Sequence, residues 1–243
     1  MRKLTRTEIE LPLTPPVTTQ AIHAPSDGEW RLFIFHGAPG NDYLFSRFLH
    51  TAPPDLDVVL AKRPGYERGA RGAITDFDHQ VAAIKPWLGD KKVIVLGVSY
   101  GGALALKAAL DFPDHIFGVA TVAALVENPR GYILAMERFS HQGWIETLAP
   151  NRWHRVRDEI ENRRTQIGGV LERLPSLKAP VEIIHGNADH LVALRDAKTL
   201  LRAFGAKPNV RLDIAPGGTH YLELQFPRRL HRAVERLIAE NAP

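Results

Sequence analysis

The sequence predicts a doubly wound α/β domain built on a parallel sheet. Six short apolar runs alternate along the chain with longer amphipathic segments, an order typical of sheets whose strands are joined by helices. The apolar runs have the composition of strands that are buried on both faces. At 243 residues, 44% of them hydrophobic, the chain has the length of one domain with room for an insertion.

The elements follow in order. The first thirty residues predict two modest strands, 4–11 and 18–23, separated by prolines. Buried strands are then predicted at 31–35, 58–61, 93–96, 118–124, 181–184 and 210–214. Helices are predicted between them at 43–49, 75–88, 100–110, 194–204 and 227–239. In the second helix, Phe77, Val81, Ile84 and Leu88 fall on one face.

The connection between the predicted strands 118–124 and 181–184 is longer than this alternation of strands and helices requires. Residues 126–180 contain no convincing strand, although a crossover between parallel strands needs only about a dozen residues. We therefore predict a helical cap at 126–180, with helices near 131–140 and 150–174, inserted into a core of residues 1–125 and 181–243. The cap's charged residues are expected to form a solvated, mutually paired surface: Arg152, Arg155, Arg163 and Arg164 with Asp158, Glu159 and Glu161.

Composition excludes several classes of function. Lys and Arg (31) barely exceed Asp and Glu (27) and are interleaved with them, which disfavours nucleic-acid binding. The absence of cysteine excludes disulfides, thiolate metal sites and a cysteine nucleophile. No apolar run of about 18 residues, phosphate-binding glycine loop or His-Glu-x-x-His motif occurs. We expect no membrane span, signal peptide, metal or cofactor, and a cytoplasmic location.

A candidate nucleophile stands at Gly97-Val98-Ser99-Tyr100-Gly101, between a predicted strand and a predicted helix. A serine in such a sharp turn has strained backbone angles, and the crowding of strand and helix requires very small neighbours. Gly97 and Gly101 supply them. The turn would lift the Ser99 hydroxyl clear of the sheet.

A serine hydroxyl needs a base, and the base needs a carboxylate to orient it. Asp189 follows the predicted strand 181–184, and His220 follows the strand 210–214. Both therefore lie at carboxyl ends of strands, where open α/β sheets bind ligands. The chain order of Ser99, Asp189 and His220 is one of the known orders for a catalytic triad. His185 and His190 flank Asp189, but a metal site needs more converging ligands.

Five ordered segments resemble the α/β-hydrolase superfamily, and within it the compact-cap serine hydrolases. They are HGAPG at 36–40, RPGY at 63–66, GVSYGG at 97–102, GNADHLV at 186–192 and GTH at 218–220. The resemblance covers nearly the whole chain. It implies a sheet of about eight strands, mostly parallel, with the first pair entering antiparallel and a small helical cap inserted after strand 6.

The resemblance also implies site residues. The amides of Ala38 and Tyr100 would form an oxyanion hole, in which each donor is worth about 3–4 kcal/mol to the transition state. Because some relatives carry their acid one strand earlier, Glu127 is the alternative to Asp189, or else a pocket wall. Residues 63–66 are interpreted as structural and His36 as a loop anchor. Glu127, Trp144, Trp153 and Tyr221 are candidates for a substrate pocket.

The predicted function is a serine hydrolase that cleaves a small acyl substrate through an acyl-enzyme. Esters, thioesters, activated amides and carbon–carbon bonds beside ketones remain open. Epoxides and haloalkanes are disfavoured, because enzymes of this fold that act on them carry aspartate where Ser99 stands. Two alternatives stay open: a ligand receptor or signalling partner with slow or single turnover, and an acyltransferase using the same triad.

Overall fold

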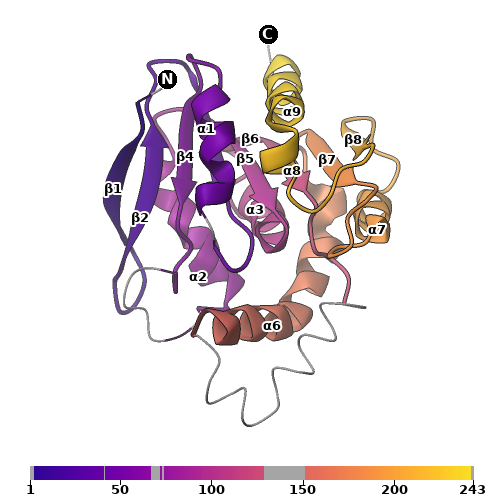
Figure 1. The fold of residues 1–243 in the computed structure, drawn as a ribbon, viewed down its shortest axis with the longest axis horizontal. Coiled ribbons are helices and arrows are strands. Elements are labelled where there is room, and N and C mark those ends of the chain that lie inside the picture. The colour runs from indigo at the N-terminus through magenta and orange to yellow at the C-terminus, as the bar shows by residue number, and fades with distance from the viewer. Residues whose placement is uncertain (1–2, 41, 67–71, 73, 129–150, 242–243) are drawn as a thin grey trace.

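The computed structural model describes residues 3–40, 42–66, 72, 74–128 and 151–241, with the backbone alone for 151–153. Its centre is one eight-stranded sheet in the order β1-β2-β4-β3-β5-β6-β7-β8 (Figure 1). The strands are β1 Thr5–Leu11, β2 Val17–Ala24, β3 Trp30–Phe35, β4 Asp57–Ala61, β5 Lys92–Val98, β6 Ile116–Val122, β7 Val181–Gly186 and β8 Val210–Ala215. The eight predicted strands are confirmed to within a few residues at their ends.

Strand direction follows the prediction as well. β1 pairs with β2 and β2 with β4 antiparallel, whereas every pair from β4 to β8 is parallel. After β3 the chain goes to one side, to β4, and then returns to the other side, to β5. The carboxyl ends of β3 and β5 therefore mark the switch point of the sheet, the place where ligands bind in open α/β folds.

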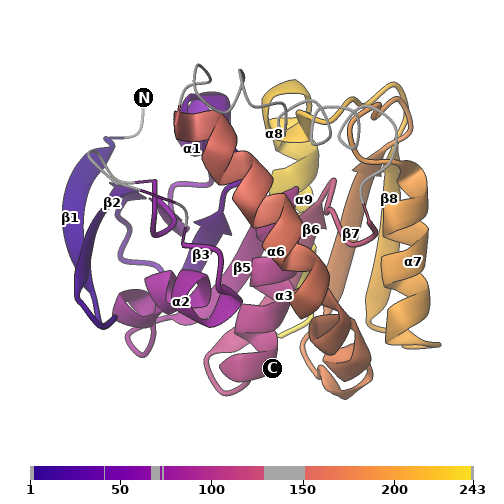
Figure 2. The same cartoon turned by 90° about the horizontal axis from the view of Figure 1, so that it is seen from below.

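Successive side chains on each strand alternate between two cores. In β3, Phe33 and Phe35 belong to one buried cluster, and Leu32 and Ile34 belong to the other. The first cluster is covered by α2 (Phe77–Val81), α3 (Tyr100–Asp111) and α7 (Leu194–Phe204), and the second by α1 (Ser46–Thr51) and α9 (Pro227–Ala239). Figure 2 shows these helices as layers on opposite sides of the sheet. Helices on both faces confirm the doubly wound architecture.

Two of the predicted helices differ in detail from those in the structure. The expected helix at 75–88 is instead α2 followed by a 3-10 helix at Ala82–Trp87, which contains Pro86. Proline lacks the amide proton that an α-helix needs at this position, which favours the change of helix type. The expected helix at 43–49 is a 3-10 turn at Asp42–Phe45 followed by α1. A further helix, α8, spans Leu222–Gln225 just after His220.

Between β6 and β7 the described chain contains α6, Asn151–Arg173, and a 3-10 turn at Leu174–Ser176. In Figure 2, α6 runs diagonally across the layer that contains α3, with which it is in contact. The expected helix near 131–140 lies outside the described residues, so the limits of the predicted cap stay a prediction.

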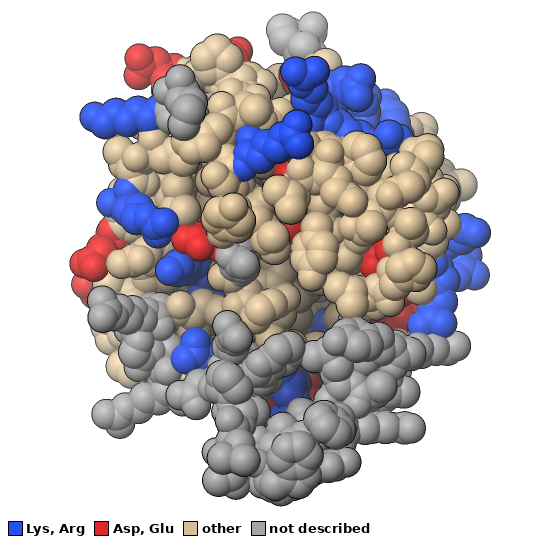
Figure 3. All heavy atoms as spheres, viewed as in Figure 1, with Lys and Arg blue, Asp and Glu red and all other residues tan. Residues whose placement is uncertain are grey.

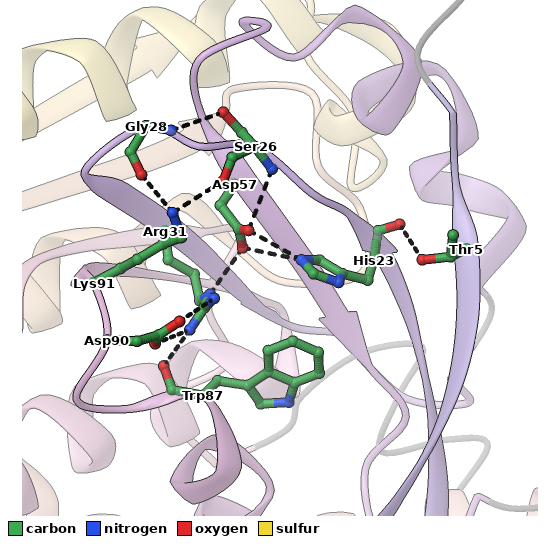
Figure 4. A network of polar contacts seen from close by, with 9 residues as sticks. All are labelled: Thr5, His23, Ser26, Gly28, Arg31, Asp57, Trp87, Asp90 and Lys91. Atoms are coloured by element: carbon green, nitrogen blue, oxygen red, sulfur yellow. Dashed lines mark hydrogen bonds and ion pairs between the residues drawn. The ribbon is translucent and has the colours of Figure 1, made fainter.

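A polar network joins the amino ends of β3 and β4 to the carboxyl end of the antiparallel strand β2. Arg31 Nε donates to Asp57 Oδ1 at 2.8 Å, and His23 Nε2 lies 3.0 Å from Asp57 Oδ2 (Figure 4). The Arg31 guanidinium also donates to both oxygens of Asp90. Burial opposes ionisation of Asp57, but these donors outweigh it and lower its pKa to about 2. This network ties β2, β3 and β4 together at the sheet edge opposite the carboxyl ends of the parallel strands.

Charges of both signs are spread over the surface. Figure 3 shows Lys and Arg side chains among Asp and Glu, with a denser basic group near α9. In α9 itself, Arg229 pairs with Asp213, and Arg236 pairs with Glu182. Of the helices in the described ranges, none is long and apolar enough to cross a bilayer.

Candidate active site

Ser99 occupies the turn between β5 and α3 with φ at 55°, a backbone conformation that non-glycine residues rarely adopt. A Cβ on Gly97 would lie 2.1 Å from the Gly101 carbonyl oxygen, and one on Gly101 would lie 2.2 Å from the Phe35 carbonyl oxygen. Glycine is therefore required at both positions. The Ser99 amide donates to the Val122 carbonyl at 2.8 Å, which anchors the turn to β6.

The loop after β3 lies against this serine. A Cβ built on Gly37 would be 3.1 Å from Ser99 Cβ and 3.7 Å from Ser99 Oγ. The Ser99 side chain makes no capping bond to α3, so its hydroxyl is not occupied in holding the helix. The Tyr100 amide stands at the first position of α3, where the helix offers no internal acceptor. Ala38 and Tyr100 thus lie on the two segments that flank Ser99.

His36 anchors this loop as a neutral ring. Its Nδ1 lies 2.7 Å from the Gly37 carbonyl oxygen, and its Nε2 accepts the Arg63 amide at 3.0 Å, which assigns the proton to Nδ1. Complete burial and the neighbouring Arg63 guanidinium lower the His36 pKa to about 3. The ring is therefore uncharged at neutral pH and is committed to two backbone partners.

Asp189 and His220 are joined directly. His220 Nδ1 lies 2.8 Å from Asp189 Oδ2, and Asp189 Oδ1 accepts the amides of Leu191 and Val192 at 2.8 and 2.9 Å. Burial of Asp189 opposes its ionisation, but the His220 hydrogen bond and the two amides outweigh it and lower its pKa. The Asp189 side chain is fully buried, whereas that of His220 is 12% exposed. An ionised carboxylate therefore orients an imidazole that solvent reaches.

Another glycine directs the His220 loop. A Cβ on Gly186, at the end of β7, would lie 2.1 Å from the Gly218 carbonyl oxygen. The Ala188 amide donates to that same oxygen at 2.9 Å. The chain that follows β8 is thus packed onto the end of β7, the neighbouring strand on the side of β5. Because β5 to β8 are parallel, this loop lies at the same edge of the sheet as the carboxyl end of β5, where Ser99 stands.

The remaining sequence candidates have separate positions. Glu127 contacts α7 rather than His220: its carboxylate accepts from Thr199 Oγ1 at 2.6 Å and pairs with Arg195 at 2.7 Å. Tyr221 is 43% exposed, with its ring centroid 5.6 Å from that of His220. Trp144 lies outside the described residues, and of Trp153 only the backbone, in α6, is described.

Possible metal ligands do not gather in the described part of the chain. His185 Nε2 bonds the Val192 carbonyl oxygen at 3.0 Å and is completely buried. No group of three or more His, Asp or Glu side chains that could hold a metal is found within the described ranges.

The expectation that the charges of the cap form a solvated surface is wrong for two of them. Glu159 and Arg163, both in α6, are completely buried. Arg163 donates to the Val126 carbonyl oxygen at 3.2 Å and to that of Glu127 at 2.5 Å. Glu159 pairs with Arg63, which is also completely buried. Charge pattern within one helix could not reveal these partners, because they come from distant loops.

Sequence reasoning also missed Glu223. This residue of α8 is 2% exposed, and its Oε2 has no hydrogen-bond partner among the described residues. Burial raises the pKa of Glu223 to about 7, and the Asp189 charge adds to the rise while His220 opposes it. In the sequence, the only signal for a role of Glu223 in the site is its position three residues after His220.

Comparisons with known proteins identify the family and the relatives that the chain resembles. The family model described as "alpha/beta hydrolase fold" matches residues 31–152. Serine hydrolase BPHL of Mus musculus is 25% identical over 212 residues, which is 76% of this chain but only 64% of that protein, less than two thirds of its length. A putative carbamate hydrolase RutD of a Caulobacter species is 26% identical and covers 84% of this chain and 86% of its own.

Solved structures agree in fold. A 2-hydroxy-6-oxo-6-phenylhexa-2,4-dienoate hydrolase from a Rhodococcus species superposes with a TM-score of 0.75 at 14% identity. The superposition covers 98% of this chain and all of that one. At this identity the likeness concerns the fold alone.

Proposed function

The chain belongs to the α/β-hydrolase fold family, and we propose that it is a serine hydrolase that cleaves a small ester, thioester or activated amide through an acyl-enzyme. The observation that carries the proposal is the hydrogen bond between Asp189 and His220 at the sheet edge that also bears the strained Ser99. Known relatives named as serine hydrolase and carbamate hydrolase support the class of reaction.

In the proposed reaction, Ser99 Oγ attacks the substrate carbonyl carbon while His220 Nε2 accepts the serine proton. The carbonyl π electrons move to oxygen, and the Ala38 and Tyr100 amides stabilise the resulting oxyanion. When the tetrahedral intermediate collapses, His220 returns the proton to the leaving group. Water then attacks the acyl-enzyme by the same route, which releases the acid and restores Ser99.

Asp189 has a supporting role in this scheme. Its Oδ2 accepts a hydrogen bond from the N–H at His220 Nδ1, which leaves Nε2 free to act as the base. Because the two amides on Oδ1 and the imidazole keep Asp189 ionised, it stabilises the imidazolium that forms in each step.

The decisive experiment is labelling with a fluorophosphonate followed by peptide mapping. The reagent phosphonylates only an activated serine, so the adduct is expected on the peptide that contains Gly97–Gly101. Ser99→Ala should abolish both the label and steady turnover of p-nitrophenyl esters. Labelling at another residue, or none, contradicts the proposed nucleophile.

Kinetics separate the proposal from a receptor or an acyltransferase. Ser99→Ala, His220→Ala and the double variant should lose similar factors in kcat, because triad members act as a unit. Tight ligand binding with negligible turnover in the wild type would favour a receptor. Diversion of product from acid to ester by an added alcohol would favour an acyltransferase.

A further inference from the structure

A buried ion pair joins α6 to the segment just after β4, which in turn contacts the loop beside Ser99. Arg63, just after β4, and Glu159, in α6, are both completely buried although they lie 96 residues apart in sequence. Both Glu159 oxygens accept from the Arg63 guanidinium, one of them at 3.1 Å from Nη2. Burying two charges is unfavourable unless each is fully hydrogen-bonded, so such a pair imposes a specific geometry on its surroundings.

Glu159 has its hydrogen-bonding capacity filled. Besides Arg63, it accepts the Tyr66 hydroxyl at 2.6 Å and Gln80 Nε2 at 3.1 Å. Burial opposes the charged form of Arg63, but the Glu159 carboxylate outweighs this effect and raises the pKa of Arg63. One carboxylate on α6 therefore fixes an arginine and two further side chains of the core.

Arg63 in turn contacts both segments that would form the oxyanion hole. Its Nε donates to the His36 carbonyl oxygen at 3.1 Å, and its Nη2 donates to the Gly37 carbonyl oxygen at 3.2 Å. Its guanidinium lies over the ring of Tyr100, 4.6 Å from the centroid, and over that of Tyr66 at 4.7 Å. The guanidinium thereby contacts two aromatic rings.

The contact to Gly37 has a direct effect on Ala38. The Gly37 carbonyl and the Ala38 amide belong to one planar trans peptide, in which C=O and N–H point in opposite directions. Arg63 Nη2 and His36 Nδ1 hold the Gly37 oxygen on one side. The Ala38 N–H must therefore point in the opposite direction within the same plane, away from Arg63 and His36.

We propose that Glu159 is a positioning residue for hydrolysis, which acts through Arg63 to fix the direction of the Ala38 amide and the place of Tyr100. This inference rests on the proposed function, because it needs an oxyanion to stabilise. It makes α6 part of the machinery for transition-state stabilisation, although Glu159 itself does not contact the reacting atoms. Docking of α6 and formation of the oxyanion hole are then one event.

The test compares two substrates. The first is the p-nitrophenyl ester that the wild type hydrolyses fastest, and the second is its thiono analogue, the same compound with C=S in place of C=O. Sulfur accepts hydrogen bonds weakly, so the thionoester gains little from a well-placed oxyanion hole. Glu159→Gln should lower kcat for the ester about tenfold or more, and kcat for the thionoester less than about threefold, with KM little changed.

A second variant keeps the test valid if Glu159→Gln does not fold. Tyr66→Phe removes only the hydroxyl that bonds Glu159 and keeps the ring under Arg63. It should lower kcat for the ester by about two- to fivefold, again with a smaller effect on the thionoester. The matched control is Glu172→Gln, the same change at an exposed position of α6, which should leave both rates unchanged.

The outcomes are distinct. Selective loss of ester turnover in Glu159→Gln, or in Tyr66→Phe alone if the first variant is unfolded, supports the inference. Equal loss on both substrates, or a change confined to KM or to the melting temperature, overturns it and leaves a structural ion pair. If the wild type neither turns over esters nor labels at Ser99, the proposed function fails first, and the inference fails with it.

Discussion

Glu223 allows a quantitative test of how burial beside the Asp189–His220 pair raises the pKa of a carboxyl group and so changes the stability of the fold. The folded protein holds its proton with a pKa of about 7, compared with 4.5 for an ordinary glutamate. As pH rises from about 4.5 to about 7, the unfolded chain releases this proton before the folded one does. The free energy of unfolding should therefore fall over that window and level off above it. At 1.36 kcal/mol per pKa unit, the full loss is about 3 kcal/mol.

Glu223→Gln removes this titration. Relative to the wild type, the variant should gain about 3 kcal/mol of stability between pH 4.5 and pH 8, on top of any constant offset from burying an amide. Urea unfolding followed by tryptophan fluorescence, at several pH values, measures the difference. Glu10→Gln, at an exposed position of β1, serves as the control. A difference that is independent of pH, or that falls as pH rises, refutes the reasoning.

Three further predictions follow from contacts described above. Asp57→Asn should lower the free energy of unfolding by about 2 kcal/mol at pH 7. Because Asp57, with its lowered pKa, stabilises the fold only while its carboxyl group is ionised, this loss should disappear as pH falls from 3.8 through about 2. Urea unfolding at both ends of this pH range measures the loss. Gly97→Ala should destabilise the protein and abolish ester turnover, since its Cβ meets the Gly101 carbonyl oxygen at 2.1 Å, whereas Gly168→Ala, with open space on α6, should raise the melting temperature slightly. Asp189→Asn should lower kcat about 10⁴-fold with the fold intact by circular dichroism, because its partner imidazole loses the required tautomer.

Much of the fold could be predicted because strands and helices leave local patterns. The alternation of apolar runs and amphipathic segments located the six strands from β3 to β8, since burial on both faces of a parallel strand requires continuous apolar residues. The division of the helix at 75–88 could also have been anticipated, because Pro86 is visible in the sequence.

The candidate site, too, could be predicted only in part from the sequence. Gly97, Ser99 and Gly101 could be found because a strained turn demands particular residue types at fixed spacing. Asp189 and His220 could be found because each follows a strand at the same sheet edge, although their 2.8 Å contact is a property of the folded chain.

What the sequence alone determined is the succession of elements and the residue types at their ends, because backbone geometry acts over a few neighbouring residues. What only the tertiary structure decided is which charges are buried and with whom they pair. Glu159 belongs to a helix whose charges resemble a solvated surface, yet it is enclosed with Arg63 by segments far away in the chain. Burial and pairing depend on the packing of distant segments, and no local spacing encodes that packing.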